Sequence, residues 1–493
     1  MLLNEVLTQH AQRHPAKVAV IAGDRQMTFA QLDDAVECMA HSLLHRGLRH
    51  GDRIAIHSYN SIEMLVLILG AFRAGLIAVP MNPRMKAPEV AYILQHSGAR
   101  ICFSDPELVA LAPGAEAIGA LPVARQTSAP LPLVSPDDPA ILLYTSGTTA
   151  RPKGVIHTQR TLFEGSSRVL AGTLTADDIV LATTQLAHVS CLMCWYFPGL
   201  IQGASVVMLR SFDPAAALDL IDRHGCTYWG GLPAGLQQIV EEQFAHPRNV
   251  STVRTIVSGG DSLPVAVQRR ILELFHVEVR ELCGMTEVLP TAFNPPGAVR
   301  PGSIGTAPQG CSLRVIDAHG NDVEPGEVGE LVLRSPASCL GYWNDPEATA
   351  SLLRDEWLHT GDLVLCDEDG YYWFKGRLKQ IIIRGGSNIS PQEVEEVLYQ
   401  HPAVLEAGVV GLPDPKFGEL PVAFVSLRAG RCCSQDDLLT HARRMLSDYK
   451  VPTKVYFLDG MPKGLTGKVD RRRLRDILLA NAELFESEIV SRV

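Results

Sequence analysis

The chain has 493 residues, more than one compact core usually holds, so we expect two or more domains. Hydrophobic residues make up 46% of the chain and charged residues 20%, a composition that excludes an intrinsically disordered protein. The formal net charge of −10 at pH 7 argues against a nucleic-acid-binding protein, which needs a basic face.

The first third of the chain alternates between helical and strand-like patterns. Such alternation is typical of α/β layers with parallel strands. Thr28 is expected to begin the second helix, because threonine is a favoured residue at a helix N-cap. The expected helices span residues 2–10, 27–48 and 61–74, and the expected strands span residues 18–21, 53–57 and 77–80.

The middle of the chain begins with a segment rich in proline and glycine, residues 112–139, which predicts a surface loop. Short β runs separated by turns between residues 303 and 333 predict a small β-rich subdomain. Strand patterns lie between these two segments, at 140–143, near Val180, and at 205–209, 228–231 and 255–258.

A further change of pattern falls near residues 376–379, where a hairpin with aromatic residues ends. We therefore predict a large N-terminal domain over residues 1–377, made of layered α/β subdomains and the small β-rich subdomain, and a small mobile C-terminal α+β domain over residues 378–493. In the C-terminal domain we expect helices at 391–398 and 435–446 and strands at 408–411, 422–427 and 455–458.

Residues 179–209 contain no Asp, Glu, Lys or Arg. A membrane-spanning helix needs about 20 predominantly apolar residues, but this stretch carries Gln185, His188, Pro198 and further polar groups. We interpret it as buried core without integral membrane association, and an uncharged lining of this kind would suit an apolar substrate.

The N-terminus has no basic segment and is not a signal peptide, and the last three residues, SRV, are not a peroxisomal signal. Eleven cysteines without regular spacing indicate free thiols in a reducing compartment, and we expect a cytoplasmic protein. Cys191 and Cys194 have the spacing of a redox or metal pair, but there is no second pair to complete a zinc site. Two small residues in a buried segment explain them better.

The segment YTSGTTARPKG at residues 144–154 follows an apolar strand and precedes a helix-like run. Its hydroxyl groups and flexible backbone can surround phosphate oxygens, and a lysine adds positive charge. Pro152 excludes a Walker A loop, which needs glycine there, and a Ser/Thr-rich surface turn is the weaker alternative. The phosphate-binding candidates are Thr145, Ser146, Gly147, Thr148, Thr149 and Lys153.

Four more motifs follow along the chain: CGMTE at 283–287, WLHTGD at 357–362, GRLKQIIIRGGSNISP at 376–391 and PKGLTGK at 462–468. Together with the segment 144–154, they cover essentially the whole chain and resemble the adenylate-forming superfamily of acyl- and aryl-CoA synthetases, peptide-synthetase adenylation domains and luciferases. The resemblance implies an acid–thiol ligase that uses ATP, Mg2+ and CoA. A carboxylic acid is first converted to an acyl-adenylate, and a thiol then displaces AMP.

The resemblance implies roles for single residues. Thr286 would bind a phosphate oxygen, and Glu287 would bind Mg2+, a cation that prefers oxygen ligands. Lys468 would neutralise charge where the carboxylate meets the α-phosphate. His188 would gate the acid pocket. Without the resemblance, a helix cap, a solvated lysine and a satisfied core histidine are the simpler interpretations.

The remaining nucleotide contacts follow in the same way. Asp362, expected in a loop after glycine, would bind the ribose hydroxyls with help from Arg377, and an Asx turn and a surface arginine are the alternatives. The other residues expected to bind ATP or AMP are Gly259, Gly260, Asp261, Cys283, Gly284 and Met285.

A hinge at Lys379 would rotate the small domain between the half-reactions. The rotation would withdraw Lys468 and present Gly385, Gly386 and Ser387, whose small size would let the pantetheine arm of CoA pass close to the backbone. A tight turn is the alternative interpretation of the two glycines.

The residues expected to line the acid pocket are Trp195, Trp229, Gly230, Gly231 and Ser258. Apart from His188 and Glu287, the segments around them (179–209, 228–233, 256–260 and 282–290) contain no Asp, Glu, Lys or Arg, so a second charge on the substrate would be left unpaired. We therefore predict an apolar monocarboxylic acid, with a medium or longer fatty acid favoured and an aromatic acid next.

CoA is the expected thiol, because the chain ends soon after Lys468 and leaves no room for a fused carrier domain; a separate carrier protein is the alternative. A non-catalytic nucleotide- or acyl-binding protein is a different class, which the intact Glu287, Asp362 and Lys468 argue against.

Ala150, Cys283 and Gln380 depart from the family pattern, and we expect them to affect ATP affinity more than activity. An oligomer is compatible with the sequence.

Overall fold

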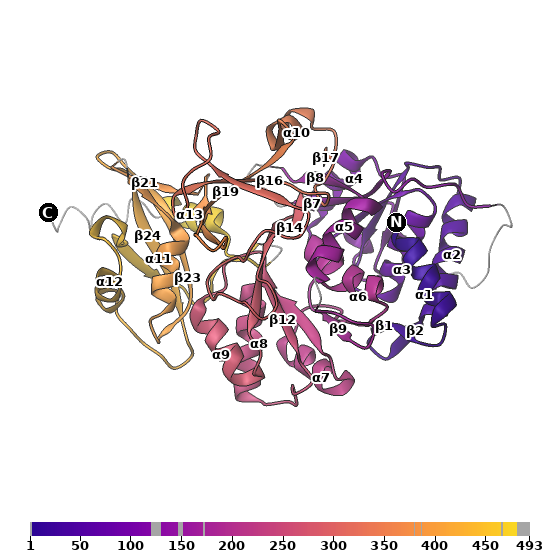
Figure 1. Cartoon of the computed structure of the whole chain (residues 1–493), viewed down its shortest axis with the longest axis horizontal. Coiled ribbons are helices and arrows are strands. Elements are labelled where there is room, and N and C mark those ends of the chain that lie inside the picture. Colours follow the sequence, from indigo (N-terminus) through magenta and orange to yellow (C-terminus); the bar gives the residue numbers. More distant parts are fainter. Residues whose placement is uncertain are drawn as a thin grey trace. The chain divides into compact units, whose positions relative to one another are not determined.

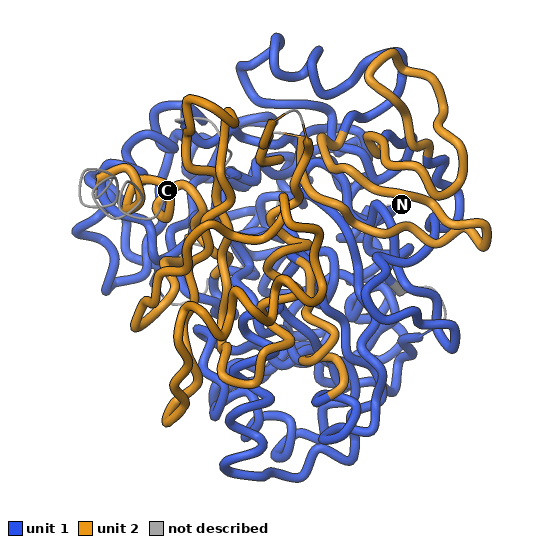
Figure 2. The backbone as a smooth tube through the Cα atoms, turned by 90° about the vertical axis from the view of Figure 1, so that its left-hand side faces the viewer, with its two compact units in different colours: residues 1–261, 270–313, 332–359 blue, residues 262–269, 314–331, 360–493 orange. Residues whose placement is uncertain are grey.

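The structure is a computed structural model that describes residues 2–119, 130–145, 151–170, 173–378, 380–385, 387–464 and 467–480. The chain divides into two compact units (Figure 2). Unit 1 comprises Met1–Asp261, Arg270–Leu313 and Val332–His359, and unit 2 comprises Ser262–Arg269, Arg314–Leu331 and Thr360–Val493. The domain boundary after residue 377 stays a prediction.

An eight-stranded sheet, sheet A, has the order β14-β13-β12-β11-β9-β10-β1-β2. Its inner strands are parallel, and the two edge strands β2 and β14 are antiparallel to their neighbours. The predicted alternation of strands and helices is thus confirmed. The strands are β1 (Val18–Ala22), β2 (Arg25–Thr28), β9 (Ile179–Ala182), β10 (Ser205–Met208), β11 (Tyr228–Gly231), β12 (Thr255–Gly259), β13 (Val279–Met285) and β14 (Val288–Phe293).

The two faces of sheet A carry different side chains, because neighbouring residues of a strand point to opposite faces. One face, named here the core face, carries Val180, Tyr228, Val257 and Leu282, which belong to the largest hydrophobic cluster. The pairing register places Leu181, Trp229 and Ile256 in one row across the strands, one residue along from the core-face positions and therefore on the opposite face. Figure 1 shows α7 (Pro214–His224) and α8 (Pro233–Ala245) packed side by side next to this sheet.

Sheet B has seven strands in the order β17-β8-β7-β4-β3-β5-β6. The segment after the predicted phosphate loop is a strand, β8, and not a helix, so that prediction was wrong. Val155 and Ile156 pair antiparallel with Leu143 and Leu142 of β7, and α5 (Gln159–Leu170) begins only after this hairpin. The strands are β3 (Arg53–His57), β4 (Ile77–Met81), β5 (Ile101–Ser104), β6 (Glu116–Ala117), β7 (Pro139–Thr145), β8 (Lys153–Thr158) and β17 (Gly341–Tyr342).

Local capping fixes several helix starts. The Thr28 hydroxyl accepts a hydrogen bond from the Gln31 amide (3.3 Å), and the Gln31 side chain accepts one from the Thr28 amide (2.9 Å), which forms a capping box before α2 (Phe29–His45). The Ser61 hydroxyl caps α3 (Ile62–Arg73) in a similar way. The other helices of this part are α1 (Leu3–Arg13), α4 (Ala87–Ser97), η1 (Val109–Leu111), the π-helix η2 (Cys191–Tyr196), α6 (Phe197–Gln202), α9 (Val265–Phe275) and α10 (Pro346–Leu352).

The uncharged stretch 179–209 folds into β9, η2, α6 and β10, all short elements. Among the helices of the described residues, none has both the length and the hydropathy that crossing a membrane requires.

A five-stranded sheet follows β14 and confirms the predicted β-rich part. β15 (Ser312–Ile316), β16 (Val328–Arg334), β19 (Trp357–Cys366) and β18 (Leu353–Arg354) lie in that order, and β20 (Tyr372–Arg377) pairs with β19. Asp362 lies within β19 and not in a loop as predicted. Asp362 pairs with Arg377 of β20, and Gly361, whose φ is +69°, lies within the same strand β19.

The C-terminal part of unit 2 is an α+β fold, as predicted. Its sheet has the order β22-β21-β24-β23, with β25 beside β24. Val409 and Val425 join a hydrophobic cluster with α11 and α12, whereas Val410 and Phe424 join another cluster with α13, so helices cover both faces. The elements are β21 (Ile382–Arg384), β22 (Ser387–Ile389), α11 (Pro391–Tyr399), β23 (Val404–Asp414), β24 (Gly418–Leu427), α12 (Gln435–Arg443), η3 (Asp448–Lys450), β25 (Lys454–Phe457) and α13 (Arg471–Ala480).

Candidate active site

The β7–β8 hairpin frames the predicted phosphate loop. Thr145 and Lys153 are directly paired at the end of the two strands that the loop connects. The Lys153 Nζ lies 3.9 Å from an Asp345 carboxylate oxygen and 4.8 Å from the centre of the Tyr342 ring, so the ammonium group is held near both. The other predicted members of the loop, together with Ala150, lie outside the described residues: Ser146, Gly147, Thr148 and Thr149.

Thr286 and Glu287 form the turn between β13 and β14. Glu287 is only 6% exposed, and its Oε1 accepts a 2.6 Å hydrogen bond from the Tyr342 hydroxyl. The backbone carbonyl of Glu287 accepts a hydrogen bond from the Cys339 amide (2.8 Å). Burial and the nearby Glu287 charge raise the pKa of the Tyr342 phenol, so it stays protonated and orients the carboxylate.

His157 of β8 supports the same turn and was not predicted as a site residue. Its Nε2 lies 2.7 Å from the Thr286 carbonyl oxygen, which can only accept, so Nε2 carries the proton. Its Nδ1 then accepts from the Thr161 hydroxyl at 2.9 Å. Burial lowers the pKa of His157 to about 4, so the ring is neutral at pH 7. No local sequence signal marks this contact, because its partner is a distant backbone carbonyl.

The carboxyl ends of β12 and β13 bring the glycines expected at the nucleotide close together. Gly259 pairs with Leu282, and a Cβ at Gly259 would lie 2.7 Å from the Leu282 carbonyl oxygen. Gly260 has a φ of +92°, which favours glycine. A Cβ at Gly284 would lie 2.4 Å from Leu289. The neighbouring Asp261, Cys283 and Met285 are partly buried at these strand ends.

His188 precedes η2 and is held by its neighbours. The Ser190 amide donates to its Nδ1 at 3.2 Å, so Nδ1 is the unprotonated nitrogen and Nε2 carries the proton in the neutral ring. The Ser190 hydroxyl lies 2.6 Å from the same Nδ1 and 3.3 Å from the Thr184 hydroxyl. Thr184 and Ser190 therefore fix His188 as a donor through Nε2.

The residues expected to line the acid pocket lie on both faces of sheet A. Trp195 of η2 belongs to the core-face cluster, and Gly230 shares a register row with Val257 of that face. Trp229 lies on the opposite face, 5.5 Å from the Phe275 ring, and Gly231 and Ser258 are in register on that face too. The two tryptophans therefore do not face each other, and membership of the acid pocket stays a prediction.

One charged residue of the core face was missed. Arg280 of β13 pairs with Val257 and is 5% exposed. It lies two residues before the segment 282–290, one of the segments whose lack of a second charge led to the predicted uncharged pocket.

In unit 2, Asp362 and Arg377 are cross-strand partners on β19 and β20, with Arg377 Nε 2.8 Å from Asp362 Oδ1. Asp362 is 3% exposed. The Asp362 amide donates to the Thr360 hydroxyl (3.0 Å), which itself donates to the Leu331 carbonyl (2.7 Å). The strand pair thus joins the two residues predicted at the ribose.

Lys468 lies in a short loop between the bridged residues Lys463 and Val469. Its carbonyl accepts from the Gly464 amide at 2.9 Å, and Gly467 has a φ of +83°. Lys468 itself is partly buried.

The segment expected to meet CoA lies elsewhere in unit 2. Gly385, with a φ of +56°, donates from its amide to the Phe417 carbonyl (2.7 Å), and Ser387 begins β22. The hinge residue Lys379 and Gly386 lie outside the described residues. Gln380, on the far side of Lys379, donates from its amide to the Arg377 carbonyl (2.8 Å).

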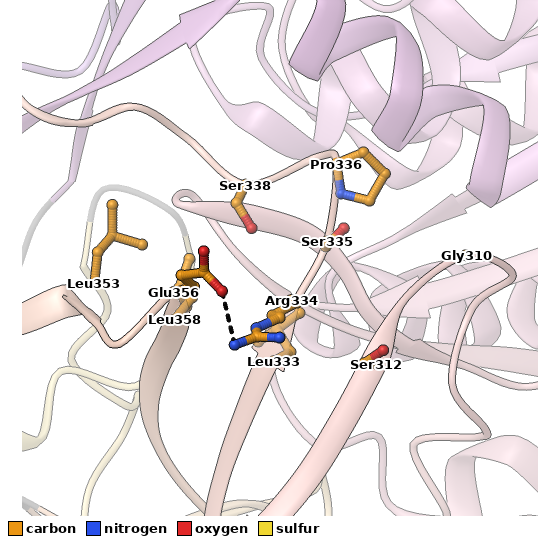
Figure 3. A pocket seen from close by; sticks show the side chains of 10 residues that line it. All are labelled: Gly310, Ser312, Leu333, Arg334, Ser335, Pro336, Ser338, Leu353, Glu356 and Leu358. Carbon is orange, nitrogen blue, oxygen red and sulfur yellow. Dashed lines mark ion pairs between the residues drawn. The ribbon is translucent and has the colours of Figure 1, made fainter.

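A surface cavity of about 340 Å³ lies in unit 1 at the ends of β16, β18 and β19. None of the predicted site residues lines it. Figure 3 shows that Arg334 and Glu356 form an ion pair there, 2.9 Å long, and Arg334 also stacks on Trp357. The two charged side chains of the cavity are therefore already paired with each other, and we assign no function to this cavity.

Comparison with known proteins identifies the family. Residues 7–343 match the family model "AMP-binding enzyme", and residues 393–468 match "AMP-binding enzyme C-terminal domain". The chain is 36% identical to a sulfoacetate–CoA ligase from Cupriavidus necator, over 96% of this chain and 97% of that protein. It is 35% identical to the fatty acid–[acyl-carrier-protein] ligase ScoC from Streptomyces coeruleorubidus, over 95% of this chain and 94% of that protein.

Among solved structures, the anthranilate CoA ligase AuaEII in complex with anthranoyl-AMP superimposes with a TM-score of 0.92 at 29% identity, covering 98% of both chains. The chain belongs to the family of AMP-binding enzymes, the adenylate-forming superfamily. It is an ATP-dependent, AMP-forming acid–CoA ligase that uses ATP, Mg2+ and CoA.

The donor groups of unit 1 fit Mg2+. Within the described ranges, no cluster of three or more His, Cys, Asp or Glu side chains could hold a metal ion by itself. Mg2+ does not need such a cluster, because it is usually bound by one or two carboxylates together with substrate phosphates and water. The oriented Glu287 carboxylate next to the Thr286 hydroxyl supplies a donor set of this kind.

Proposed function

We propose that the chain activates a carboxylic acid with an apolar body, a medium- or longer-chain fatty acid first and an aromatic acid second, and transfers the acyl group to CoA. The core face of sheet A carries this proposal. It is apolar over β9, β10 and β11, and on β13 and β14 it presents Leu282 and Phe293. Leu282 precedes the Thr286–Glu287 turn by only four residues, so an acid lying on this face would end near the nucleotide groups.

In the proposed first half-reaction, the acid carboxylate attacks the α-phosphate of ATP and pyrophosphate leaves. Lys153 and Thr145 hold phosphate oxygens, Glu287 holds Mg2+, and Lys468 stabilises charge at the reacting phosphate. Bound Mg2+ supplies charge neutralisation at the phosphates. Asp362 and Arg377 bind the ribose, and His188 donates from Nε2 beside the acid carboxylate.

In the proposed second half-reaction, a hinge at Lys379 turns the C-terminal domain so that Gly385, Gly386 and Ser387 admit the thiol. The thiol sulfur attacks the acyl carbon of the adenylate, and the bond to AMP breaks. A separate carrier protein is the second candidate acceptor, because one relative with 35% identity is named as a carrier-protein ligase.

The test is acid-dependent pyrophosphate release from ATP, measured over a panel of acids, followed by thioester analysis with CoA or with a phosphopantetheinylated carrier protein. We expect octanoate or benzoate to exceed acetate, glycine and malonate in kcat/KM. An amino acid or malonate that exceeds both apolar acids would contradict the apolar body. Thioester formed only on the carrier protein would contradict CoA as the acceptor.

We also propose a cytoplasmic location. All eleven cysteines are free thiols, which suits a reducing compartment. Cys191 and Cys194 are buried within η2, and burial raises the pKa of the Cys191 thiol to about 12. These thiols are protonated at pH 7 and serve as core residues, as the sequence suggested.

A further inference from the structure

Arg280 is a buried cation on the core face of sheet A. Its Nε donates to the Asn294 carbonyl at 2.9 Å, and its Nη1 donates to the Thr173 hydroxyl at 3.2 Å. The guanidinium lies 4.0 Å from the centre of the Phe293 ring. All three partners are neutral. Within the described part of the chain, Arg280 takes part in no ion pair with a carboxylate.

An arrangement of this kind is costly for the protein alone. Arginine stays charged at any pH that a folded protein meets, and a buried charge without a counter-charge is strongly disfavoured. Neutral carbonyl and hydroxyl acceptors offset only part of that cost. A guanidinium fork with two bonded nitrogens and an aromatic ring on one side is suited to bind an oxyanion with its remaining donors.

Tyr228 adds a second, independent observation. It lies on the core face with 1% exposure, and its hydroxyl has no hydrogen-bond partner among the described residues. Burial raises the pKa of its phenol, and in sheet A only β12 separates β11, which carries Tyr228, from β13, which carries Arg280. Gly230 shares a register row with Val257 and Arg280, so Val257 is the residue of this row beside Arg280 and Gly230 adds no side chain next to it.

We infer that Arg280 and Tyr228 recognise an anionic group, a carboxylate or a sulfonate, at the far end of the acid substrate. The inference rests on the acid activation of the proposed function and revises its first choice of acid: the acid keeps an apolar body but carries a second, distal anion. Arg280 precedes Gly284 by four residues, or roughly 13 Å of strand. The two ends of the acid are therefore separated by a chain of several carbons or by an aromatic ring with a side chain.

The cost of an unpaired buried charge, which favoured a monocarboxylic acid, favours a second anion once Arg280 is taken into account. A second anion was excluded because it would be left unpaired in an uncharged pocket, but Arg280 is the residue left unpaired without it. Leu282 and Phe293, which lie between Arg280 and the Thr286–Glu287 turn, match the apolar body of such an acid.

The test compares acids of equal length with and without the second anion, octanoate with suberate and decanoate with sebacate. The readout is kcat/KM for pyrophosphate release. We expect the wild-type enzyme to prefer the longer diacids over their monoacid partners. Arg280→Met should lower the diacid-to-monoacid ratio by roughly 10- to 100-fold, and Tyr228→Phe by roughly 3- to 10-fold.

Arg254→Met is the matched control. Arg254 also lies near the start of these strands, but its side chain is 55% exposed and pairs with Asp178, so its removal should leave the ratio unchanged. Arg280→Lys keeps the charge with fewer donors and should retain part of the preference, which covers the case in which Arg280→Met does not fold. Thermal unfolding of each variant separates misfolding from altered selectivity.

The outcomes distinguish this inference from the proposed function. If no acid of the panel releases pyrophosphate, the proposed function fails. If the monoacids react and the wild-type enzyme prefers them at each length, the inference fails and the proposed function stands. An equal ratio in Arg280→Met and Arg254→Met would likewise overturn it.

Discussion

Two parts of the molecule carry the groups that we propose to act at the phosphates of ATP. The Thr286–Glu287 turn carries Glu287, and the Lys468 loop (residues 463–469) carries Lys468. Each part is held in place in a different way. The turn is held from outside: His157, Cys339 and Tyr342 come from β8, the segment before β17, and β17. The loop closes on itself through the Lys463–Val469 bridge and the bond from the Gly464 amide to the Lys468 carbonyl.

The difference matches the proposed roles of the two groups. A metal ligand must keep one position through the whole reaction. Hydrogen bonds from several segments raise the free energy that is needed to move it. A lysine needed in only one half-reaction benefits from a loop that keeps its own shape, because the loop can then move with its domain without losing internal bonds. The following experiments test this contrast.

Lys468→Ala should have the largest effect. Loss of the ammonium group should lower the rate of acyl-adenylate formation by about 10²- to 10³-fold, the scale of removing one group that stabilises transition-state charge. Thioester formation from supplied acyl-AMP should change little. Pyrophosphate release and thioester yield measure the two steps separately, and equal losses in both would contradict a lysine that acts in one half-reaction.

Lys463→Ala is the control in the same loop. Its ammonium group pairs with Glu406 at 2.8 Å, and its loss should change both half-reactions to the same small extent.

His157→Gln should change how stability depends on pH. Burial lowers the pKa of His157 from 6.5 to about 4, so between these values the unfolded chain binds a proton that the folded chain does not. The stabilisation is complete above pH 6.5 and is lost as pH falls toward 4, by about 3 kcal/mol in total. Urea unfolding at pH 7.5 and pH 5 should show a smaller acid loss in the variant.

His246→Gln serves as the comparison for His157, because it removes an imidazole whose side chain is 71% exposed. It should keep the pH dependence of the wild type. If His157→Gln keeps it as well, His157 is not the buried neutral support of the turn.

Tyr342→Phe removes the hydrogen bond to Glu287 while keeping the ring near Lys153. A hydrogen bond to a charged group contributes about 1.5–3 kcal/mol, so we expect the Mg2+ concentration for half-maximal activity to rise by roughly 10- to 100-fold. Titration of pyrophosphate release with Mg2+ at saturating ATP measures this. Tyr449→Phe, at a side chain on the surface of unit 2, should leave the titration unchanged.

Ser190→Ala should have the smallest effect. Without the hydroxyl, the Nδ1 of His188 loses one of its two partners, and we expect the KM for the acid to rise about 5-fold, the scale of one neutral hydrogen bond. Nitrogen NMR of the imidazole should show a larger share of the Nδ1–H tautomer, a readout that a loss of packing alone would not produce. Thr184→Ser, which keeps a hydroxyl beside Ser190, should behave as the wild type.

Features that depend on neighbouring residues were predictable from the sequence. The N-cap at Thr28 and the strand at 140–143 are set by residues a few positions apart, and both are present. Likewise, the two residues Thr286 and Glu287 were singled out together because they are adjacent in a motif.

Features that depend on pairing across the chain were not predictable. His157 and Thr286 meet only because β8 and the β13–β14 turn are brought together, and Trp229 faces away from Trp195 because of strand register. The sequence of β8 was interpreted as the start of a helix. Its strand character comes from pairing with β7, which lies on the other side of the phosphate-loop motif in the sequence. Asp362 was expected in a loop because glycine precedes it, but its strand partner Arg377 continues the sheet.

Strand β13 also has a consequence for how enzymes of this kind diversify. Arg280 and Leu282 point to the core face, whereas the turn at its end holds Thr286 and Glu287 through contacts that involve neither residue. Under the proposals above, substitutions at 280 or 282 should change the acid that is accepted while leaving the contacts of Thr286 and Glu287 in place. Laboratory selection at these two positions should therefore yield variants with a changed choice of acid and an unchanged Mg2+ requirement.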